Sequence, residues 1–209
     1  MSWRSIAQIA LAVPMVVWLA GCDKPPEEQI TATKAAVDAT VQAEAAKYAA
    51  PELAQLQDSL KAALAEVDRQ NARFIFLRDY AGAKATLTWV GTRAPQVAQT
   101  AKANKEKMRA ATQQAIETAQ AAVDSAAALL AAAPRGKESK QDMEAMEAEI
   151  TSLRAGLDEA RAGLAAEDFN KAKVKAQDMQ TRALEIQNEV AAVIQKYEEL
   201  MAKRRGRRG

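Results

Sequence analysis

The sequence contains no histidine and only one cysteine, and these absences exclude most of the familiar catalytic and metal-binding arrangements. Without histidine there is no imidazole general base, no Ser-His-Asp or Cys-His arrangement, and no His-containing zinc or di-iron site. One cysteine cannot form a thiolate cluster, and no glycine-rich phosphate-binding motif is present. The sequence therefore predicts a protein that is not an enzyme and that uses no cofactor or metal.

Aromatic residues make up only 4% of the 209 residues, and there are eight glycines and six prolines against 50 alanines. This composition favours long helices and argues against a β-sandwich or barrel. Large hydrophobic side chains are too few for a deep globular core. We therefore expect an all-α protein made of elongated antiparallel helical hairpins or bundles.

The amino-terminal segment MSWRSIAQIALAVPMVVWLAGC is typical of a signal peptide, which we assign to residues 1–21. A positive charge at Arg4 precedes an apolar run from Ile6 to Leu19. The run is shorter than the ~20 apolar residues of a spanning helix, and Pro14 interrupts it. We expect the segment to direct export and to be removed.

The segment Leu19-Ala20-Gly21-Cys22 resembles the lipobox of bacterial lipoproteins. The resemblance implies cleavage between Gly21 and Cys22, diacylglycerol on the Cys22 sulfur and a third acyl chain on its new amino group. A thiol is the side chain best suited to alkylation, which supports lipidation of Cys22. The alternative interpretation is that Cys22 is a buried structural cysteine. We expect a lipid-anchored protein in the cell envelope, facing the periplasm.

Asp23 resembles the enteric signal that retains lipoproteins in the inner membrane, so it favours that membrane over the outer one. Pro25 and Pro26 cannot continue a helix from the anchor, and residues 22–28 are predicted to form a lipidated linker.

From residue 29 onward, apolar residues recur with the spacing of coiled-coil helices. The predicted helices lie approximately at 30–48, 51–67, 79–133, 143–164 and 168–200, and the last two are expected to form an antiparallel hairpin. Asp79 and Asp168 are possible helix caps, and Gly91 and Pro95 are expected to bend or interrupt the third helix. A shift of the apolar face near Met108 predicts that this helix changes partners there.

Several segments of the two halves are similar, for example DSLKAALAE at 58–66 and TSLRAGLDE at 151–159. Internal duplication and chance similarity of alanine-rich helices both explain this. We expect a first helical unit at 29–110 and a second at 111–202, possible tandem three-helix units that share a long central helix.

The segment Tyr48-Ala49-Ala50-Pro51-Glu52-Leu53 resembles a turn in the alanine-rich envelope lipoproteins of the uncharacterised DUF4398-type family. The resemblance covers residues 30–115 and implies a helical envelope module. It supplies no catalytic residues, and the second half lacks the motif.

Four aromatic residues lie at the junction of the second and third predicted helices, and they either close the end of the bundle or form a partner surface. They are Phe74, Phe76, Tyr80 and Trp89. Asn104, on an otherwise apolar seam, either fixes register or oligomeric state or lies on an exposed seam.

The carboxyl-terminal residues 203–209 form a basic tail. Lys203, Arg204, Arg205, Arg207 and Arg208 are expected to contact an anionic envelope surface, the alternative being a merely solubilising tail. No nucleic acid partner is expected after export.

The predicted function is that of an envelope spacer or adaptor, with a possible homo-oligomer or envelope protein partner. The alternative is a helical binding module for an apolar ligand or a partner helix.

Overall fold

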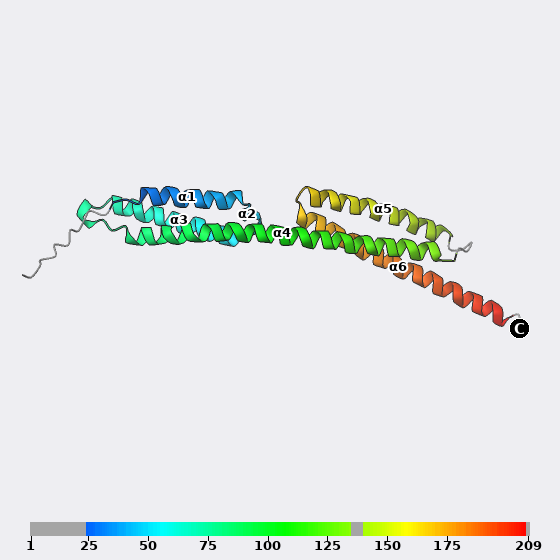
Figure 1. The fold of residues 1–209 in the computed structure, drawn as a ribbon. Coiled ribbons are helices and arrows are strands. Elements are labelled where there is room, and N and C mark those ends of the chain that lie inside the picture. Colours follow the sequence, from blue (N-terminus) through cyan, green and yellow to red (C-terminus); the bar gives the residue numbers. More distant parts are fainter. Residues whose placement is uncertain (1–23, 135–139, 208–209) are drawn as a thin grey trace, which may run out of the picture. The chain divides into compact units, whose positions relative to one another are not determined.

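The computed structural model describes residues 24–134 and 140–207, and this part of the chain is all-α, with no strand. The helices divide into two compact units; Figure 1 labels the helices and colours them along the sequence. Unit 1 comprises the described residues up to Ala46 together with Ala50–Ala98. Unit 2 comprises Lys47–Ala49 and the residues from Gln99 onward. The expected helical-bundle fold is therefore confirmed.

Unit 1 consists of α1 (Glu27–Gln42), α3 (Ala50–Asn71) and the first part of α4 (Ala81–Ala132). The 3-10 helix η1 (Ile75–Leu77) lies in the turn between α3 and α4. Leu56, Leu87 and Val90 are fully buried, and two threonines of α1 donate hydrogen bonds to α4 carbonyls. Thr33 donates to Leu87 O and Thr40 to Ala94 O. Large apolar side chains are few, so these buried hydroxyls add directional contacts to the core.

The predicted helix at 30–48 is split, because α1 ends at Gln42 and a short helix α2 (Ala45–Tyr48) follows. Glu44 adopts a left-handed backbone with φ of 59°, which a helix interior does not tolerate. Pro51 lies in the first turn of α3 as expected, where its missing N–H is not needed.

The helix α4 runs without a break through Gly91 and Pro95, so the expectation of an interruption there is wrong. Pro95 lies on an exposed face, while Ala94 and Val97 on the opposite side are buried in unit 1. Packing of these neighbours holds the helix across the hydrogen bond that proline cannot donate.

Unit 2 consists of the remainder of α4, α5 (Lys140–Ala165) and α6 (Phe169–Gly206), with Tyr48 packed against it. One apolar core joins the three helices and includes Val123, Leu157 and Ile186. Ion pairs between Glu159 and Lys175 and between Glu149 and Arg182 show that α5 and α6 are antiparallel, as predicted.

The apolar seam predicted for α6 continues to Leu200, but Val190 is the last buried residue of that helix. Tyr197 is 38% exposed and Leu200 48% exposed. The seam is therefore covered within the chain only as far as Val190. The periodicity of a sequence records which residues share a face, and a face is buried only where a partner helix covers it.

Candidate functional surfaces

The three most exposed large hydrophobic side chains of the described residues, and the exposed Ile75 beside them, lie together in the turn between α3 and α4 of unit 1. Phe74 is 82% exposed, Ile75 48%, Phe76 87% and Leu77 66%. We call residues 74–77 the apolar turn. Exposed apolar residues are common singly, but a contiguous group of this kind marks an interaction surface.

Hydrogen bonds hold the backbone of the apolar turn in place. The Leu77 N–H donates to Phe74 O at 2.8 Å, closing η1. The Arg78 side chain donates to Arg73 O at 3.1 Å and to Asn71 O at 2.8 Å, so it bridges the two sides of the turn. The exposure of the four side chains therefore belongs to an ordered turn.

The start of α4 is fixed by polar contacts next to the apolar turn. Asp79 Oδ1 accepts a 2.9 Å hydrogen bond from the Ala81 N–H, which confirms Asp79 as a helix cap. The Asp79 N–H donates to Gln70 Oε1 at 3.0 Å. These bonds tie the turn to both helices that it connects.

The four aromatic residues that the sequence places at this junction do not form one group. Tyr80 is fully buried and packs with Val67 and Ala83, as expected of a residue that closes the bundle. Phe74 and Phe76 are exposed, so bundle closure is wrong for them. Trp89 is 41% exposed on α4. Phe74, Phe76 and Trp89 are therefore accessible to a partner, and Tyr80 is not.

The turn between α5 and α6 centres on Glu167, which has a left-handed backbone with φ of 60°. Its carboxylate accepts hydrogen bonds from Lys105 at 2.5 Å and Arg109 at 2.9 Å, both on α4. Its carbonyl accepts one from Lys47 at 3.0 Å. The hydrogen bond from Lys105, with the positive charges of Lys105 and Arg109, lowers the pKa of the Glu167 carboxyl.

An aromatic contact lies beside this turn in unit 2. The Tyr48 and Phe169 ring centroids are 6.4 Å apart, and the Arg109 guanidinium lies 5.8 Å from the Phe169 centroid. Thr112 donates to Phe169 O at 3.1 Å, and Asn104 donates to Tyr48 O at 2.8 Å. Asn104 thus holds α2 against α4 within one chain. These ring contacts and hydrogen bonds fasten the turn and α2 to α4, so the cluster is best explained as structural.

Asp168 stands at the N-cap of α6 as predicted, but its side chain makes no capping hydrogen bond. The expected cap is therefore correct in position only, and Glu167 supplies the polar contacts of this turn.

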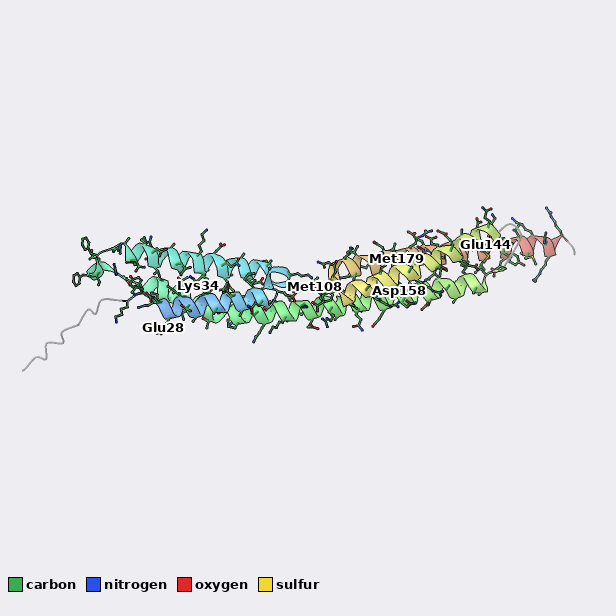
Figure 2. The ribbon with its side chains drawn as sticks, turned by 90° about the horizontal axis from the view of Figure 1, so that it is seen from above. Glu28, Lys34, Met108, Glu144, Asp158 and Met179 are labelled. Carbon is green, nitrogen blue, oxygen red and sulfur yellow. The ribbon has the colours of Figure 1, made fainter. Side chains whose placement is uncertain are left out.

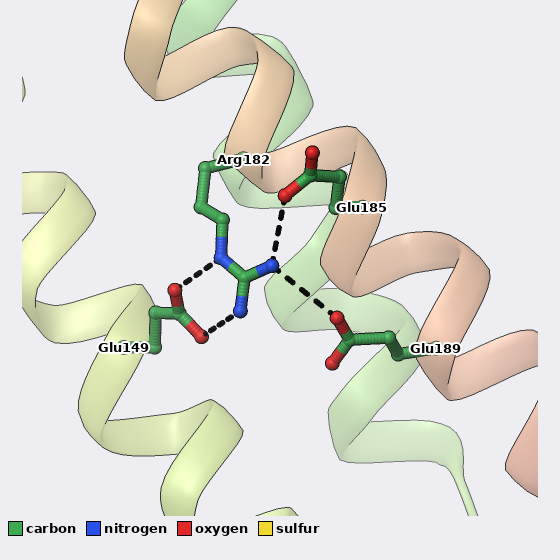
Figure 3. Close-up of polar contacts among 4 residues, drawn as sticks. All are labelled: Glu149, Arg182, Glu185 and Glu189. Carbon is green, nitrogen blue, oxygen red and sulfur yellow. Dashed lines mark hydrogen bonds and ion pairs between the residues drawn. The ribbon is translucent and has the colours of Figure 1, made fainter.

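Arg182 on α6 is the centre of a second polar network (Figure 3). Its guanidinium forms two parallel hydrogen bonds with the Glu149 carboxylate on α5, that between Nη2 and Oε2 being 2.7 Å long. It also contacts Glu185 at 2.8 Å and Glu189 at 3.3 Å. The hydrogen bonds from Arg182 lower the pKa of Glu149, and those to the glutamates raise the pKa of Arg182. The network links α5 to α6.

The basic residues near the carboxyl terminus are exposed. Lys203, Arg204 and Arg205 lie in the last turn of α6, which continues to Gly206, and Arg207 follows as its cap. Helical backbone therefore presents most of the predicted basic tail. Arg208 lies outside the described residues, and so do the predicted processing residues Gly21, Cys22 and Asp23.

Hollows on the described surface are open grooves along helices. One of about 500 Å³ lies between α4 and α5 and is lined in part by Gln113, Ile116 and Leu164. Figure 2 labels Met179, which lines another such hollow on α6.

Within residues 24–134 and 140–207 no group of acidic side chains is placed to hold a metal ion. No helix in the same ranges combines the length and apolar character needed to cross a membrane.

Comparison with protein-family models, with curated proteins and with solved structures gives no match to this chain. The resemblances to lipoproteins therefore remain predictions from the residues that carry them.

Proposed function

We propose that the protein is a lipid-anchored, periplasm-facing lipoprotein that acts as a structural spacer or adaptor of the cell envelope. The observation that carries the proposal is the segment Leu19-Ala20-Gly21-Cys22, placed directly after an apolar run and holding the only cysteine of the chain. Several acyl chains on Cys22 anchor a protein far more firmly than a single chain.

The character of the described helices supports a role in holding or connecting rather than in converting a substrate. The two polar networks of unit 2, around Arg182 and Glu167, connect its helices to one another. Long helices with charged outer faces suit a spacer, and the basic residues from Lys203 onward offer a second, weaker contact with anionic envelope polymers or lipids. The apolar turn and Trp89 provide accessible side chains for a partner.

The proposal is tested by expressing the wild type and the Cys22→Ala variant and fractionating the envelopes. We expect wild-type protein that has lost residues 1–21, carries the mass of acyl chains on Cys22 and sediments with a membrane. The Cys22→Ala variant is expected to lack the acyl mass. Trp18→Phe is the matched control, because it alters the leader but keeps the lipobox and the apolar run.

Acylated wild type and control together with a non-acylated Cys22→Ala variant support the proposal, and the membrane in which the protein is found tests the expectation drawn from Asp23. Wild-type protein that retains residues 1–21 and carries no lipid overturns it.

A further inference from the structure

We propose that the apolar turn, residues 74–77, inserts into the lipid bilayer to which the chain is tethered, so that unit 1 contacts the membrane at a second point. The identity of that membrane rests on the proposed function, but the insertion itself is a separate property of unit 1. It makes Phe74 and Phe76 membrane-contacting residues, a role that the sequence alone did not distinguish from bundle closure.

The first argument is the amount of apolar surface that is left in water. Phe74, Phe76 and Leu77 have the three highest exposures among the large hydrophobic residues of the described chain. Removing such surface from water is favourable, and aromatic rings suit the region between headgroups and acyl chains. Transfer of the apolar turn from water into an apolar phase is therefore favourable.

The second argument is that the backbone of the turn is already hydrogen-bonded where it enters and leaves. A polar backbone group that enters an apolar phase without a partner is costly. Leu77 N–H is bonded to Phe74 O, and Arg78 occupies the carbonyls of Arg73 and Asn71. These bonds reduce the cost of dehydrating the backbone when the side chains insert.

The third argument is the charge at the edges of the turn. Arg73 and Arg78 flank residues 74–77, and within the described residues neither guanidinium forms an ion pair with a carboxylate. The following carboxylate, Asp79, is occupied by the Ala81 N–H at the start of α4. Arginines beside an apolar insertion are placed to bind lipid phosphates while their stems lie along the apolar surface.

The fourth argument is position within unit 1. Gln29, in the first turns of α1, donates hydrogen bonds to Lys84 O at 3.0 Å and to Thr88 Oγ1 at 2.7 Å on α4. Ile30 packs on the cluster that contains Val67 and Tyr80. The start of α1 and the apolar turn therefore lie at the same end of unit 1, as Figures 1 and 2 show, with Glu28 labelled in the second.

The number of residues between the predicted anchor and α1 sets an upper limit on the distance of Cys22 from this end of unit 1. Only residues 23–26 separate Cys22 from Glu27, and an extended chain of five steps spans at most about 18 Å. A bilayer that holds lipid on Cys22 is therefore within reach of the end of unit 1 that carries the apolar turn. A tether this short raises the local concentration of lipid at the turn, which makes even a small insertion effective.

A second copy of the chain is the main competing occupant. A symmetric contact between two apolar turns brings the Arg73 and Arg78 pairs of both copies together, and like charges in close contact are unfavourable. A bilayer offers phosphates to the same guanidinium groups. The observations therefore favour lipid.

The experiment places an environment-sensitive label on the turn of the full-length chain. Phe76→Cys is labelled with a nitrobenzoxadiazole dye in wild-type and Cys22→Ala backgrounds and bound to phosphatidylcholine vesicles with and without phosphatidylglycerol. We expect emission to shift to shorter wavelength and to be quenched by brominated acyl chains. Val174→Cys, exposed on α6 of unit 2, is the matched control and is expected to keep an aqueous spectrum.

Label counting separates this inference from the proposed function. In acylated protein the Cys22 sulfur is blocked and residue 76 is the only labelled thiol, whereas two labels reveal an unmodified Cys22. A label at residue 76 that enters the bilayer in the Cys22→Ala background supports insertion whatever the state of the anchor. A label that stays accessible to aqueous iodide in acylated, membrane-bound protein overturns insertion and leaves the anchor intact.

Two further variants refine the test. Changing Phe74 and Ile75 to Ser in the labelled chain removes apolar surface, and we expect a severalfold loss of quenching by brominated lipid. Val174→Ser with Leu184→Ser removes exposed apolar surface elsewhere and is expected to change nothing. A spectral shift that depends on protein concentration and occurs without vesicles identifies a second copy as the occupant and overturns the proposal.

Discussion

The Tyr80 hydroxyl donates a 2.5 Å hydrogen bond to Asn71 Oδ1, which joins the end of α3 to the start of α4. The Tyr48 hydroxyl is also buried, but it has no hydrogen-bond partner within the described residues. The two tyrosine hydroxyls therefore differ in hydrogen bonding: that of Tyr80 has a partner and that of Tyr48 has none within the described residues.

Removal of each hydroxyl is expected to have opposite effects on the free energy of unfolding. Tyr80→Phe leaves Asn71 without its donor and lowers stability by about 0.5–1.5 kcal/mol. Tyr48→Phe removes an unpaired buried polar atom and is neutral or stabilising, by up to about 1 kcal/mol. Chemical denaturation of both variants at one pH measures the difference. A loss of stability in Tyr48→Phe equal to that in Tyr80→Phe contradicts the expectation.

Two glycine-to-alanine changes are predicted to differ in sign. Gly82, in the first turn of α4, has nothing within 4 Å of an added methyl group, so Gly82→Ala gains about 0.5 kcal/mol from helix propensity. A methyl on Gly163 lies 3.1 Å from Ala172 Cβ, which cannot rotate away. Gly163→Ala is expected to cost about 1 kcal/mol or more.

The double variant Gly163→Ala with Ala172→Gly tests the cause of that cost. The two sites are in direct contact, so the cycle should show a favourable coupling energy of about 0.5 kcal/mol or more. Additive losses in thermal unfolding would mean that contact between α5 and α6 is not the reason.

The pair formed by Glu149 and Arg182 predicts a pH dependence of stability. The pKa of Glu149 is lower in the folded protein than its ordinary value, so its ionisation stabilises the fold above about pH 4.3. This contribution is lost as the pH falls through the lowered pKa. Both side chains are about one-third exposed, and solvent screening limits the effect at pH 7 to about 0.5–1 kcal/mol.

Glu149→Gln is therefore expected to be less stable than wild type at pH 7, with the difference shrinking as the pH falls below 4. Denaturant midpoints measured across this range provide the test. Glu198→Gln is the control, because Glu198 is exposed and has no ion-pair partner in the described part of the chain. A constant difference at all pH values counts against the ion pair.

Asn104 is expected to matter for stability within the monomer. Asn104→Ala removes the 2.8 Å bond to Tyr48 O and should cost about 0.5–1.5 kcal/mol in denaturant unfolding. Asn188→Ala, an exposed change on α6, should be nearly neutral. Sedimentation of both variants is expected to be unchanged. An altered oligomeric state in Asn104→Ala alone indicates the register or assembly role instead.

Helical periodicity carried most of the information that predicts this fold. Leu157 on α5 and Ile186 on α6 each belong to a series of apolar residues at heptad spacing, and both are fully buried in the same core. Pro51 and Asp79 marked helix starts through local chemistry, since proline fixes φ and a carboxylate accepts backbone N–H groups. These signals need only a few neighbouring residues, so they are readable from sequence.

Other features depend on contacts between distant residues and have no local signal. Glu44 and Glu167 adopt left-handed backbone without being glycine or asparagine, and Glu167 does so while bound by Lys105 and Arg109. Phe74 and Phe76 carry the same aromatic signal as Tyr80, yet only Tyr80 finds a core. The run Phe74-Ile75-Phe76-Leu77 between arginines was the available clue to the apolar turn.

The loss of burial along α6 after Val190 has a consequence for the lifetimes of its backbone hydrogen bonds. Amide protons from Ala176 to Val190 are shielded by neighbouring helices and should exchange with deuterium slowly. Beyond Val193 the side chains are mostly exposed, and fraying from the carboxyl end opens those amides first. One continuous helix thus holds two populations of amides, a slow one in the core of unit 2 and a fast one that carries the arginines.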